Sequence, residues 1–492
     1  MPSLHAFDVA VFGAGPAGMG AASAATGLGL STVVMDEQRA PGGQIYRAIE
    51  TTPLTDRRVL GKDYWYGTAL IDEFARSSAI YEPRTTIWGL ARPRKDGPWQ
   101  IGVSRDGQAK FVHARHVVLA TGAQERPMPI PGWTLPGVMG VGAAQILLKT
   151  SALVPSGRVI VAGSGPLLFL LVAQLARVGV RITQVLDTTP RGRLRATWRQ
   201  WGDFALSPYM VKGLRLALEA SAKVKFERHV DAIEATGSAH LEAVRYRVGG
   251  REKWIAADML LLHQGVVPNI NLTAATGCAL EWNALQDCFR PHVDLFGASS
   301  IEGLSIAGDA AGVGGARVAD IQGRLAAFNA AFALGRLNSL EREQRSKKIR
   351  RELTRWLRGR AFVDAMYRPS MNFTAPEDRT IVCRCEEVTA GAVRRAIRTG
   401  CQGPNQLKSF LRCGMGPCQG RFCGLTINAL FAEERNIAPG QAGYYRLRFP
   451  IKPLALAELA ALPQTPQSVQ AVVRLPAPSM QNDVEHRSSS PG

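Results

Sequence analysis

The sequence predicts an α/β fold that contains two nucleotide-binding βαβ units, followed by a small cysteine-rich domain. Residues 6–38 run as an apolar strand, a glycine turn, an Ala-rich helix and a second strand, and residues 157–187 repeat that order. Six of the eight cysteines lie between Cys383 and Cys423, which favours a metal or cluster site over a disulfide framework. Because 492 residues are too many for one ordinary core, we expect at least three domains.

The composition excludes several classes of function. The chain is 46% hydrophobic and 20% charged, as in ordinary folded proteins. Its net charge of +19 comes from scattered Lys and Arg, so we expect no nucleic-acid partner; acidic proteins or peripheral contact with an anionic membrane suit such a surface better. The longest apolar stretch, Val159 to Ala176, is interrupted by glycines and a proline, which argues against a transmembrane segment. No secretion signal precedes the first strand, so we expect a cytoplasmic protein.

The first glycine turn has the sequence Gly13-Ala14-Gly15-Pro16-Ala17-Gly18, directly after a strand and at the start of a helix. In this setting the first glycine permits the tight turn, the second lets the backbone approach a pyrophosphate, and the third lets the helix pack closely on the strand. The helix N-terminus then stabilises the phosphate charge. A carboxylate follows the second strand, where the adenosine ribose hydroxyls would lie; we favour Asp36 and keep Glu37 as the alternative.

Together with three further segments, this turn resembles the two-dinucleotide-binding-domain flavoproteins, the class that contains thioredoxin reductase and glutathione reductase. The segments are Pro41-Gly42-Gly43-Gln44, Val117-Val118-Leu119-Ala120-Thr121-Gly122 and Leu304-Ser305-Ile306-Ala307-Gly308-Asp309. The resemblance implies FAD as cofactor, with Asp309 on its ribityl chain and with the other motif residues Gly42, Gly43, Gln44, Thr121, Gly122 and Gly308 at the same site. It also implies an FAD domain split into residues 1–130 and 272–335, with an NAD(P)-type domain inserted at residues 131–271.

The second glycine turn, Gly163-Ser164-Gly165-Pro166-Leu167-Leu168, has leucine at the position of the third glycine. We expect Leu168 to push the helix from the strand and to disturb the binding of a dinucleotide, although Asp187 could take ribose hydroxyls and Arg191, Arg193 and Arg195 could face phosphate. Three alternatives stay open: hydride exchange with NAD(P)H, a nucleotide such as NAD or ATP bound without redox use, and no nucleotide.

The sequence lacks the catalytic disulfide of that flavoprotein class. No CxxC pair occurs near the first helix or in the middle domain, and Cys278 and Cys288 are interpreted as structural. Electrons from the flavin must therefore leave by another route.

The cysteine-rich block spans residues 379–435, between a helical linker at 336–378 and an extension at 436–492 whose end we expect to be disordered. Cys383-Arg384-Cys385 and Cys418-Gln419-Gly420-Arg421-Phe422-Cys423 supply two pairs of thiolates, which suit either Zn²⁺ or a [2Fe-2S] cluster. Iron is favoured because Gly414, Gly416 and Gly420 leave backbone N–H groups free to approach sulfide.

This block resembles the bacterioferritin-associated ferredoxin type of [2Fe-2S] domain. The resemblance implies Cys383, Cys385, Cys418 and Cys423 as ligands. Cys401 and Cys413 lie outside the two pairs, although Cys413 is close to the second one. His263 and His292 are isolated, and we expect no site at either.

Over residues 7–430 the chain resembles the FAD-dependent alpha (large) subunits of hetero-oligomeric amine and imino-acid dehydrogenases, the group of the opine oxidase, hydroxyproline dehydrogenase and hydrogen cyanide synthase subunits. Residues 125–145, 263–269 and 307–327 carry this resemblance. It implies a beta subunit of the D-amino-acid oxidase type with its own flavin, which oxidises a C–N bond to an imine, and a small ferredoxin-like subunit is a further candidate. This chain would then forward electrons. The alternatives are an NAD(P)H-dependent reductase that works through the cluster and a non-catalytic subunit that keeps its cofactors for stability.

Overall fold

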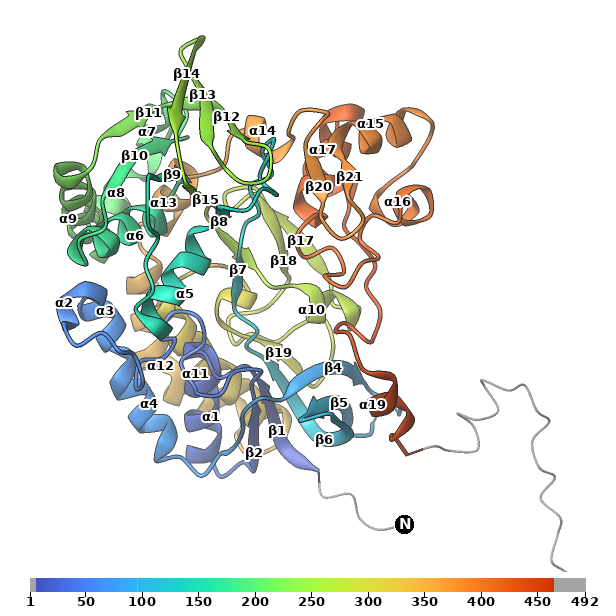
Figure 1. Ribbon diagram of the computed structural model, residues 1–492. Coiled ribbons are helices and arrows are strands. Elements are labelled where there is room, and N and C mark those ends of the chain that lie inside the picture. The colour runs from blue at the N-terminus through green and yellow to red at the C-terminus, as the bar shows by residue number, and fades with distance from the viewer. Residues whose placement is uncertain (1–5, 95, 464–492) are drawn as a thin grey trace, which may run out of the picture.

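The structure is a computed structural model that describes residues 6–94 and 96–463. Its first sheet, in the lower part of Figure 1, has seven strands; the pairs β4–β5 and β5–β6 are antiparallel and the other pairs are parallel. β1 is buried from Val9 to Phe12, as is typical of a parallel strand covered on both faces. In spatial order the strands are β3 (Ile80–Glu82), β2 (Thr32–Met35), β1 (Phe7–Phe12), β6 (Gln108–Leu119), β5 (Trp99–Arg105) and β4 (Thr86–Ala91), and β19 (Leu304–Ile306) pairs with β6.

A second sheet of five parallel strands is formed before the chain returns to β19. The first sheet is thus interrupted in sequence, in the order expected of a split domain with an insertion. The strands are, in spatial order, β11 (Phe226–Arg228), β10 (Ile182–Asp187), β9 (Val159–Ser164), β15 (Met259–Gln264) and β8 (Val138–Gly140).

Antiparallel strands complete the body. A three-stranded sheet stands above the second sheet in Figure 1. The strands β7 and β16 pair with each other where the chain crosses between the two large sheets: β7 follows β6 of the first sheet, and β16 follows β15 of the second. Their bounds are β12 (Val230–Thr236), β13 (Ala243–Val248), β14 (Arg251–Ala256), β7 (Ala123–Glu125), β16 (Val266–Pro268), β17 (Leu280–Asn283) and β18 (Cys288–Pro291).

Helices cover both sheets. Around the first sheet and in the linker are α1 (Pro16–Gly27), α2 (Arg57–Leu60), α3 (Lys62–Trp65), α4 (Gly67–Ala75), α10 (Asn271–Ala275), α11 (Ala316–Ala333), α12 (Ser339–Leu357), α13 (Arg360–Met366) and α14 (Met371–Thr374). Around the second sheet are α5 (Val141–Ser151), α6 (Pro166–Arg177), α7 (Arg193–Ala196), α8 (Trp201–Ala205) and α9 (Pro208–Lys223). Among the described residues, no helix has the length and apolar character needed to cross a membrane.

The cysteine-rich domain is a small helical unit with its own core, drawn in orange in Figure 1. The chain after it returns to the first sheet, where the Ile451 N–H donates to the Trp88 carbonyl at 3.0 Å and the Ile451 side chain is buried. The predicted disordered end, residues 464–492, lies outside the described part. The elements are β20 (Ile381–Cys383), β21 (Val388–Thr389), α15 (Ala390–Arg398), α16 (Pro404–Leu411), α17 (Gly424–Arg435), α18 (Pro439–Ala442) and α19 (Leu456–Ala460).

Helices α1 and α11 pack against each other with almost no space between their backbones. A Cβ added at Gly323 would lie 1.9 Å from the Ala17 carbonyl oxygen, and one added at Gly20 would lie 2.4 Å from the Asp320 carboxylate. Only glycine permits this approach, which brings the N-terminus of α1 against the loop before α11.

Gly323→Ala is therefore expected to lower the free energy of unfolding by about 1–3 kcal/mol, because the added methyl group must separate two packed helices. Chemical denaturation of purified protein measures this loss. The matched control is Gly27→Ala: it lies in α1, the other helix of this pair, has open space around its Cβ position, and should leave stability unchanged or raise it by up to about 1 kcal/mol. Equal stability of the two variants would contradict the account of this contact.

Candidate functional site

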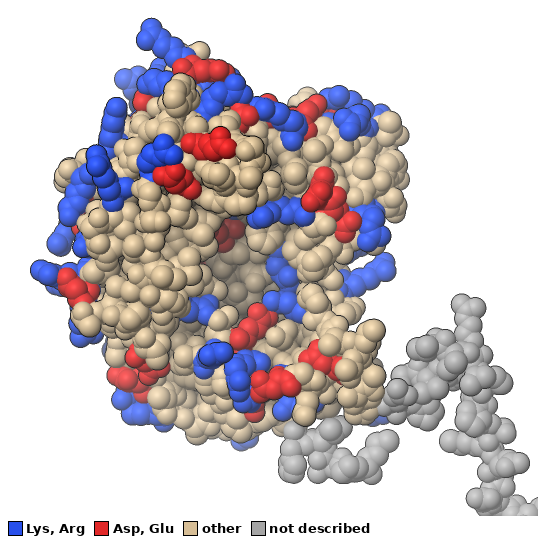
Figure 2. Space-filling model, viewed as in Figure 1, with Lys and Arg blue, Asp and Glu red and all other residues tan. Residues whose placement is uncertain are grey.

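A single large cavity of about 2210 Å³ contains most of the predicted binding residues. It lies between the two sheets and opens on the face shown in Figure 2, where Lys and Arg side chains surround the hollow. The cavity exceeds the roughly 300–1,000 Å³ of an ordinary ligand pocket, so it has room for a dinucleotide and more. Its basic lining suits phosphate groups and includes Arg57, Arg58, Lys62, Arg126, Lys149, Arg177, Lys212, Arg215, Arg317, Arg360, Arg368, Arg421 and Lys452.

The first glycine turn forms one wall of this cavity. Gly13 has φ +100°, and a Cβ there would lie 2.6 Å from the Ala120 carbonyl oxygen; a Cβ on Gly18 would lie 1.7 Å from the Gly13 carbonyl oxygen. Gly13 and Gly18 are thus each required by a backbone contact. Pro16 begins α1, so the free N–H groups of this helix face the space that the turn encloses.

The other flavin motifs converge on the same turn. A Cβ on Gly43 would lie 2.8 Å from the Gly15 Cα, and one on Gly308, whose φ is +70°, would lie 2.6 Å from the Ala17 Cβ. The cavity is also lined by Gln44, Thr121, Gly122 and Asp309. Segments that are far apart in the sequence therefore build one site.

The two candidate ribose ligands have different surroundings. Asp36 is buried, and its carboxylate accepts the Ala14 N–H at 2.5 Å and the Gln38 N–H at 2.6 Å. Burial raises its pKa, and these backbone hydrogen bonds counteract that effect. Glu37 also lines the cavity and forms an ion pair with Lys452 at 2.8 Å. Asp36 therefore fixes the turn, whereas the Glu37 carboxylate has no backbone N–H bound to it among the described residues.

Asp309 stands at the start of the loop that leads into α11. Its Oδ1 accepts the N–H groups of Gly314 at 2.9 Å and Gly315 at 3.0 Å. These bonds fix the loop while the residue stays on the cavity wall.

Lys149 is a buried cation at this site that the sequence did not single out. From α5, near the second sheet, its Nζ donates to the carbonyl oxygens of Gln44 at 3.2 Å and Ile45 at 3.0 Å, in the flavin motif loop. Burial lowers its pKa to about 7. A lysine in a helix carries no sequence signal for such a contact, because its partners are backbone atoms of a distant loop.

The second glycine turn also precedes a helix, but its backbone differs from that of the first turn, since Gly165 has φ +114° whereas Gly15 has φ −76°. A Cβ on Gly163 would lie 1.7 Å from the His263 carbonyl oxygen, and α6 begins at Pro166 just as α1 begins at Pro16. The Leu168 side chain is 1% exposed and packs in the core under α6. The effect of Leu168 on the spacing between helix and strand stays a prediction. Asp187, Arg191, Arg193 and Arg195 do not line the cavity.

His263 was expected to have no role, yet it lies on the cavity wall with an acidic partner. Its Nδ1 is 2.6 Å from the Glu125 Oε1, and it is 1% exposed. Its Nε2 lies 3.6 Å from the Cβ position of Gly165, at the start of α6, and has no hydrogen-bond partner among the described residues. His263 and Glu125 are far apart in the sequence, so no sequence pattern could indicate that they form a pair.

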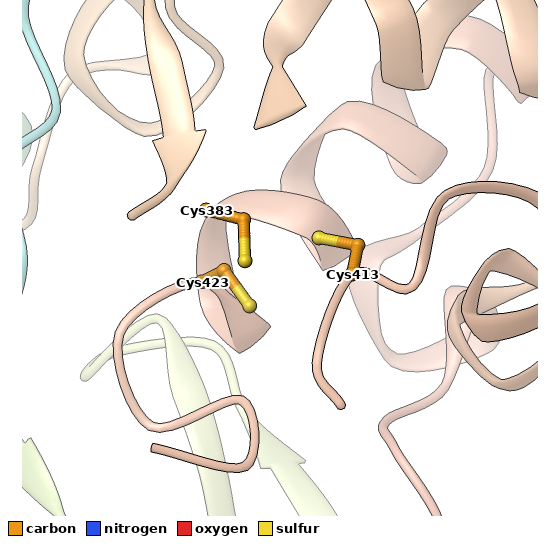
Figure 3. Close-up of side chains that lie close together, drawn as sticks. All are labelled: Cys383, Cys413 and Cys423. Carbon is orange, nitrogen blue, oxygen red and sulfur yellow. The ribbon is translucent and has the colours of Figure 1, made fainter. Parts of the chain in front are cut away.

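Three buried cysteines face a common space in the small domain (Figure 3). The Sγ atoms of Cys383, Cys413 and Cys423 lie within 4.8 Å of one another. Hydrogen bonds from the thiols of Cys413 and Cys423, together with the Gly414 and Glu386 N–H groups, lower the pKa of Cys383 to about 2. The predicted ligands Cys383 and Cys423 thus lie together with Cys413, which is outside the two cysteine pairs of the motif.

The other two predicted ligands, Cys385 and Cys418, form a neighbouring pair. Cys385 is exposed and Cys418 is half-buried, and partial burial together with the neighbouring Cys418 thiol raises the pKa of Cys385. Five thiols and two backbone N–H groups suit an iron-sulfur cluster with four thiolate ligands. Cys401 is set apart, with its thiol 3.6 Å from the Gly403 carbonyl, and Cys278 and Cys288 are buried elsewhere.

The loop between Cys418 and Cys423 contacts the wall of the large cavity directly. Gln124 Nε2 donates to the Arg421 carbonyl at 2.8 Å, and Asn271 Nδ2 donates to the Gln419 carbonyl at 2.9 Å. Gln124, Asn271 and Arg421 all line the cavity. The cysteine site and the dinucleotide site are therefore joined by two hydrogen bonds.

Comparison with known proteins agrees with this geometry. Residues 7–335 match the family of pyridine nucleotide-disulphide oxidoreductases, and residues 381–433 match the BFD-like [2Fe-2S] binding domain. The chain is 46% identical to an opine oxidase subunit of Rhizobium meliloti, over 98% of this chain and 92% of that protein. It is 48% identical to the corresponding opine oxidase subunit of Agrobacterium tumefaciens (strain Ach5), over 95% of this chain and 94% of that protein.

The fold also matches a solved structure, L-proline dehydrogenase from P. horikoshii, with a TM-score of 0.67 and 18% identity over 92% of this chain and 79% of that one. The predicted fold class, the resemblance to the alpha-subunit group and the two predicted cofactors, FAD and a [2Fe-2S] cluster, are confirmed. The chain therefore belongs to the pyridine nucleotide-disulphide oxidoreductase family, as an FAD-dependent oxidoreductase subunit that also carries a [2Fe-2S] domain.

Proposed function

We propose that this chain is the electron-transferring subunit of a multi-subunit dehydrogenase or oxidase that converts the C–N bond of a secondary amine, imino acid or opine to an imine. The observation that carries the proposal is the contact between the Cys418–Cys423 loop and the cavity wall through Gln124 and Asn271. FAD exchanges electrons in pairs or singly and a [2Fe-2S] cluster exchanges them one at a time, which is the chemistry that the two groups supply when bound.

The residues around the flavin cavity serve binding and orientation in this proposal. The turn from Gly13 to Gly18 and the N-terminus of α1 hold the pyrophosphate, Asp309 holds the ribityl chain, and the motif glycines allow close backbone approach. We assign the ribose hydroxyls to Glu37, because Asp36 is occupied by the N–H groups of Ala14 and Gln38.

For the cluster we propose Cys383, Cys385, Cys418 and Cys423 as ligands, with Cys413 as a hydrogen-bonding neighbour. This set keeps both cysteine pairs of the motif and uses the half-exposed as well as the buried thiols. Zinc would suit the same thiolates but would leave the flavin without an electron acceptor on this chain.

The proposed partner is a beta subunit of the D-amino-acid oxidase type that carries its own flavin and removes hydride from the substrate. The two opine oxidase relatives are each named as one subunit of that enzyme, which supports a complex. We further propose that the complex is cytoplasmic and that it includes a small ferredoxin-like subunit. A quinone or another acceptor then takes the electrons.

A nucleotide such as NAD or ATP is proposed for the second glycine turn. Gly165 and Pro166 of the turn line the cavity, the wall is basic, and the buried His263, paired with Glu125, faces the start of α6. Reduction by NAD(P)H is the second candidate function, and the position of Gly165 and Pro166 on the cavity wall is the observation that favours it. The sequence contains no catalytic disulfide of that flavoprotein class, and this favours the electron-transferring subunit over the reductase.

Glu37→Gln is expected to weaken FAD binding about tenfold, because a charge-assisted hydrogen bond to the ribose is replaced by a neutral one. Fluorescence titration of the apoprotein with FAD measures the change. Lys452→Gln removes the ion pair of Glu37 and, as the control, should leave the affinity nearly unchanged, since exposed ion pairs contribute little. If Glu37→Gln bound FAD with unchanged affinity, the ribose hydroxyls would be assigned to Asp36 instead.

Alanine variants of the cysteines test the ligand set. Cys383→Ala, Cys385→Ala, Cys418→Ala and Cys423→Ala should each lose the EPR signal of the reduced cluster and most of the iron and acid-labile sulfide, because a thiolate ligand is missing. Cys413→Ala should retain the cluster, as should Cys401→Ala, the control within the same core. Loss in Cys413→Ala together with retention in Cys418→Ala would exchange these two residues in the ligand set.

The function is tested by purifying the chain with its co-encoded neighbours and screening opines, sarcosine, hydroxyproline and glycine for anaerobic bleaching of flavin absorbance. The complex should be bleached by one of these amines, whereas the isolated chain should not, since substrate oxidation belongs to the partner. NADH should bleach neither. Full bleaching of the isolated chain by NADH would overturn the proposed electron-transferring role in favour of a reductase. A flavin that no substrate reduces within the complex would support a non-catalytic subunit that keeps its cofactors for stability.

A further inference from the structure

Tyr445 is a buried residue beside the cysteine site that comes from outside the matched [2Fe-2S] segment. That segment ends at residue 433, and the chain then folds back through α18 to place Tyr445 next to the cysteines. Asn428 of α17 anchors this return, since its Nδ2 donates to the carbonyls of Pro439 at 2.8 Å and Gly443 at 2.9 Å. Tyr445 is 2% exposed and belongs to the core of the small domain.

The hydroxyl group of Tyr445 points at two cysteine sulfurs. Its Oη lies 3.6 Å from the Cys413 Sγ and 3.7 Å from the Cys423 Sγ. These sulfurs are its only hydrogen-bond partners in the described part of the chain. A buried hydroxyl requires a partner, so sulfur is the acceptor for which this tyrosine is placed.

Two glycines of the cysteine motif make room for the ring. A Cβ on Gly414 would lie 2.6 Å from ring atoms of Tyr445, and a Cβ on Gly420 would lie 2.5 Å from them. Both glycines also have positive φ, +88° and +78°. Any side chain at either position would displace the ring, so the loops around the cysteines are shaped to receive this tyrosine.

We propose that Tyr445 is a positioning residue for the cluster. Its hydroxyl donates to the Cys413 Sγ in this structure and lies equally near the Cys423 Sγ. With Cys423 as a thiolate ligand, the hydroxyl donates its hydrogen bond to that sulfur and raises the reduction potential of the cluster. A donor at a ligand sulfur withdraws negative charge and so stabilises the reduced state more than the oxidised one. The buried ring also keeps water from the Cys413–Cys423 side of the site. This inference rests on the cluster assignment of the proposed function.

Tyr445→Phe removes only the hydroxyl group and should lower the equilibrium constant for one-electron reduction of the cluster about tenfold, which corresponds to a midpoint about 59 mV more negative. An EPR-monitored redox titration of the anaerobically purified full chain measures the shift. Tyr444→Phe is the matched control: its hydroxyl is 3.5 Å from the Gly420 carbonyl and contacts no sulfur, so its midpoint should equal that of the wild type.

A second measurement begins with the wild-type protein, so it gives a result even if the variant folds poorly. Exchange into D₂O should shift the Fe–S(Cys) stretching bands in the resonance Raman spectrum, and the shift attributable to an O–D donor should be lost in Tyr445→Phe but kept in Tyr444→Phe. Equal midpoints for all three proteins, or an unchanged isotope shift in Tyr445→Phe, would overturn the role of Tyr445 while leaving the cluster in place. Wild-type protein without iron and sulfide would instead overturn the cluster assignment of the proposed function and this inference with it.

Discussion

The structure depends on the approach of backbone to backbone at the first glycine turn. Gly13 contacts the residue after β6, Gly18 contacts the turn itself, and Gly308 contacts the Ala17 methyl group of α1, so three distant segments meet with no side chain larger than alanine between them. Hydrogen bonds from Ala14 to Asp36 and from Gly314 and Gly315 to Asp309 then fix the loops on either side. The cavity exists because these contacts hold the N-terminus of α1 open to it rather than covered by side chains.

The sequence was sufficient wherever local backbone geometry determines residue type. The glycine turns, the apolar strands and the split order of the first sheet were predicted because glycine at a close contact and apolar residues in a buried strand leave few alternatives. The same reasoning identified the cysteine-rich block as a cluster site.

Contacts between distant segments could not be predicted in this way. Cys413, Lys149 and the His263–Glu125 pair acquire their surroundings only when separate elements pack together. The effect of Leu168 stays a prediction for a related reason: whether a leucine displaces a helix depends on the space beneath that helix, and the Leu168 side chain lies in the core under α6.

The short segment at Ile451 and Lys452 joins three parts of the molecule. It accepts a hydrogen bond from Arg421 of the cysteine loop, donates one to Trp88 of the first sheet, and pairs with Glu37 at the cavity. A domain tied in this manner is not a carrier that swings on a flexible tether between donor and acceptor. The separation of the two redox sites is instead built into the fold, so the rate of exchange between them is set by a fixed distance and not by a search in solution.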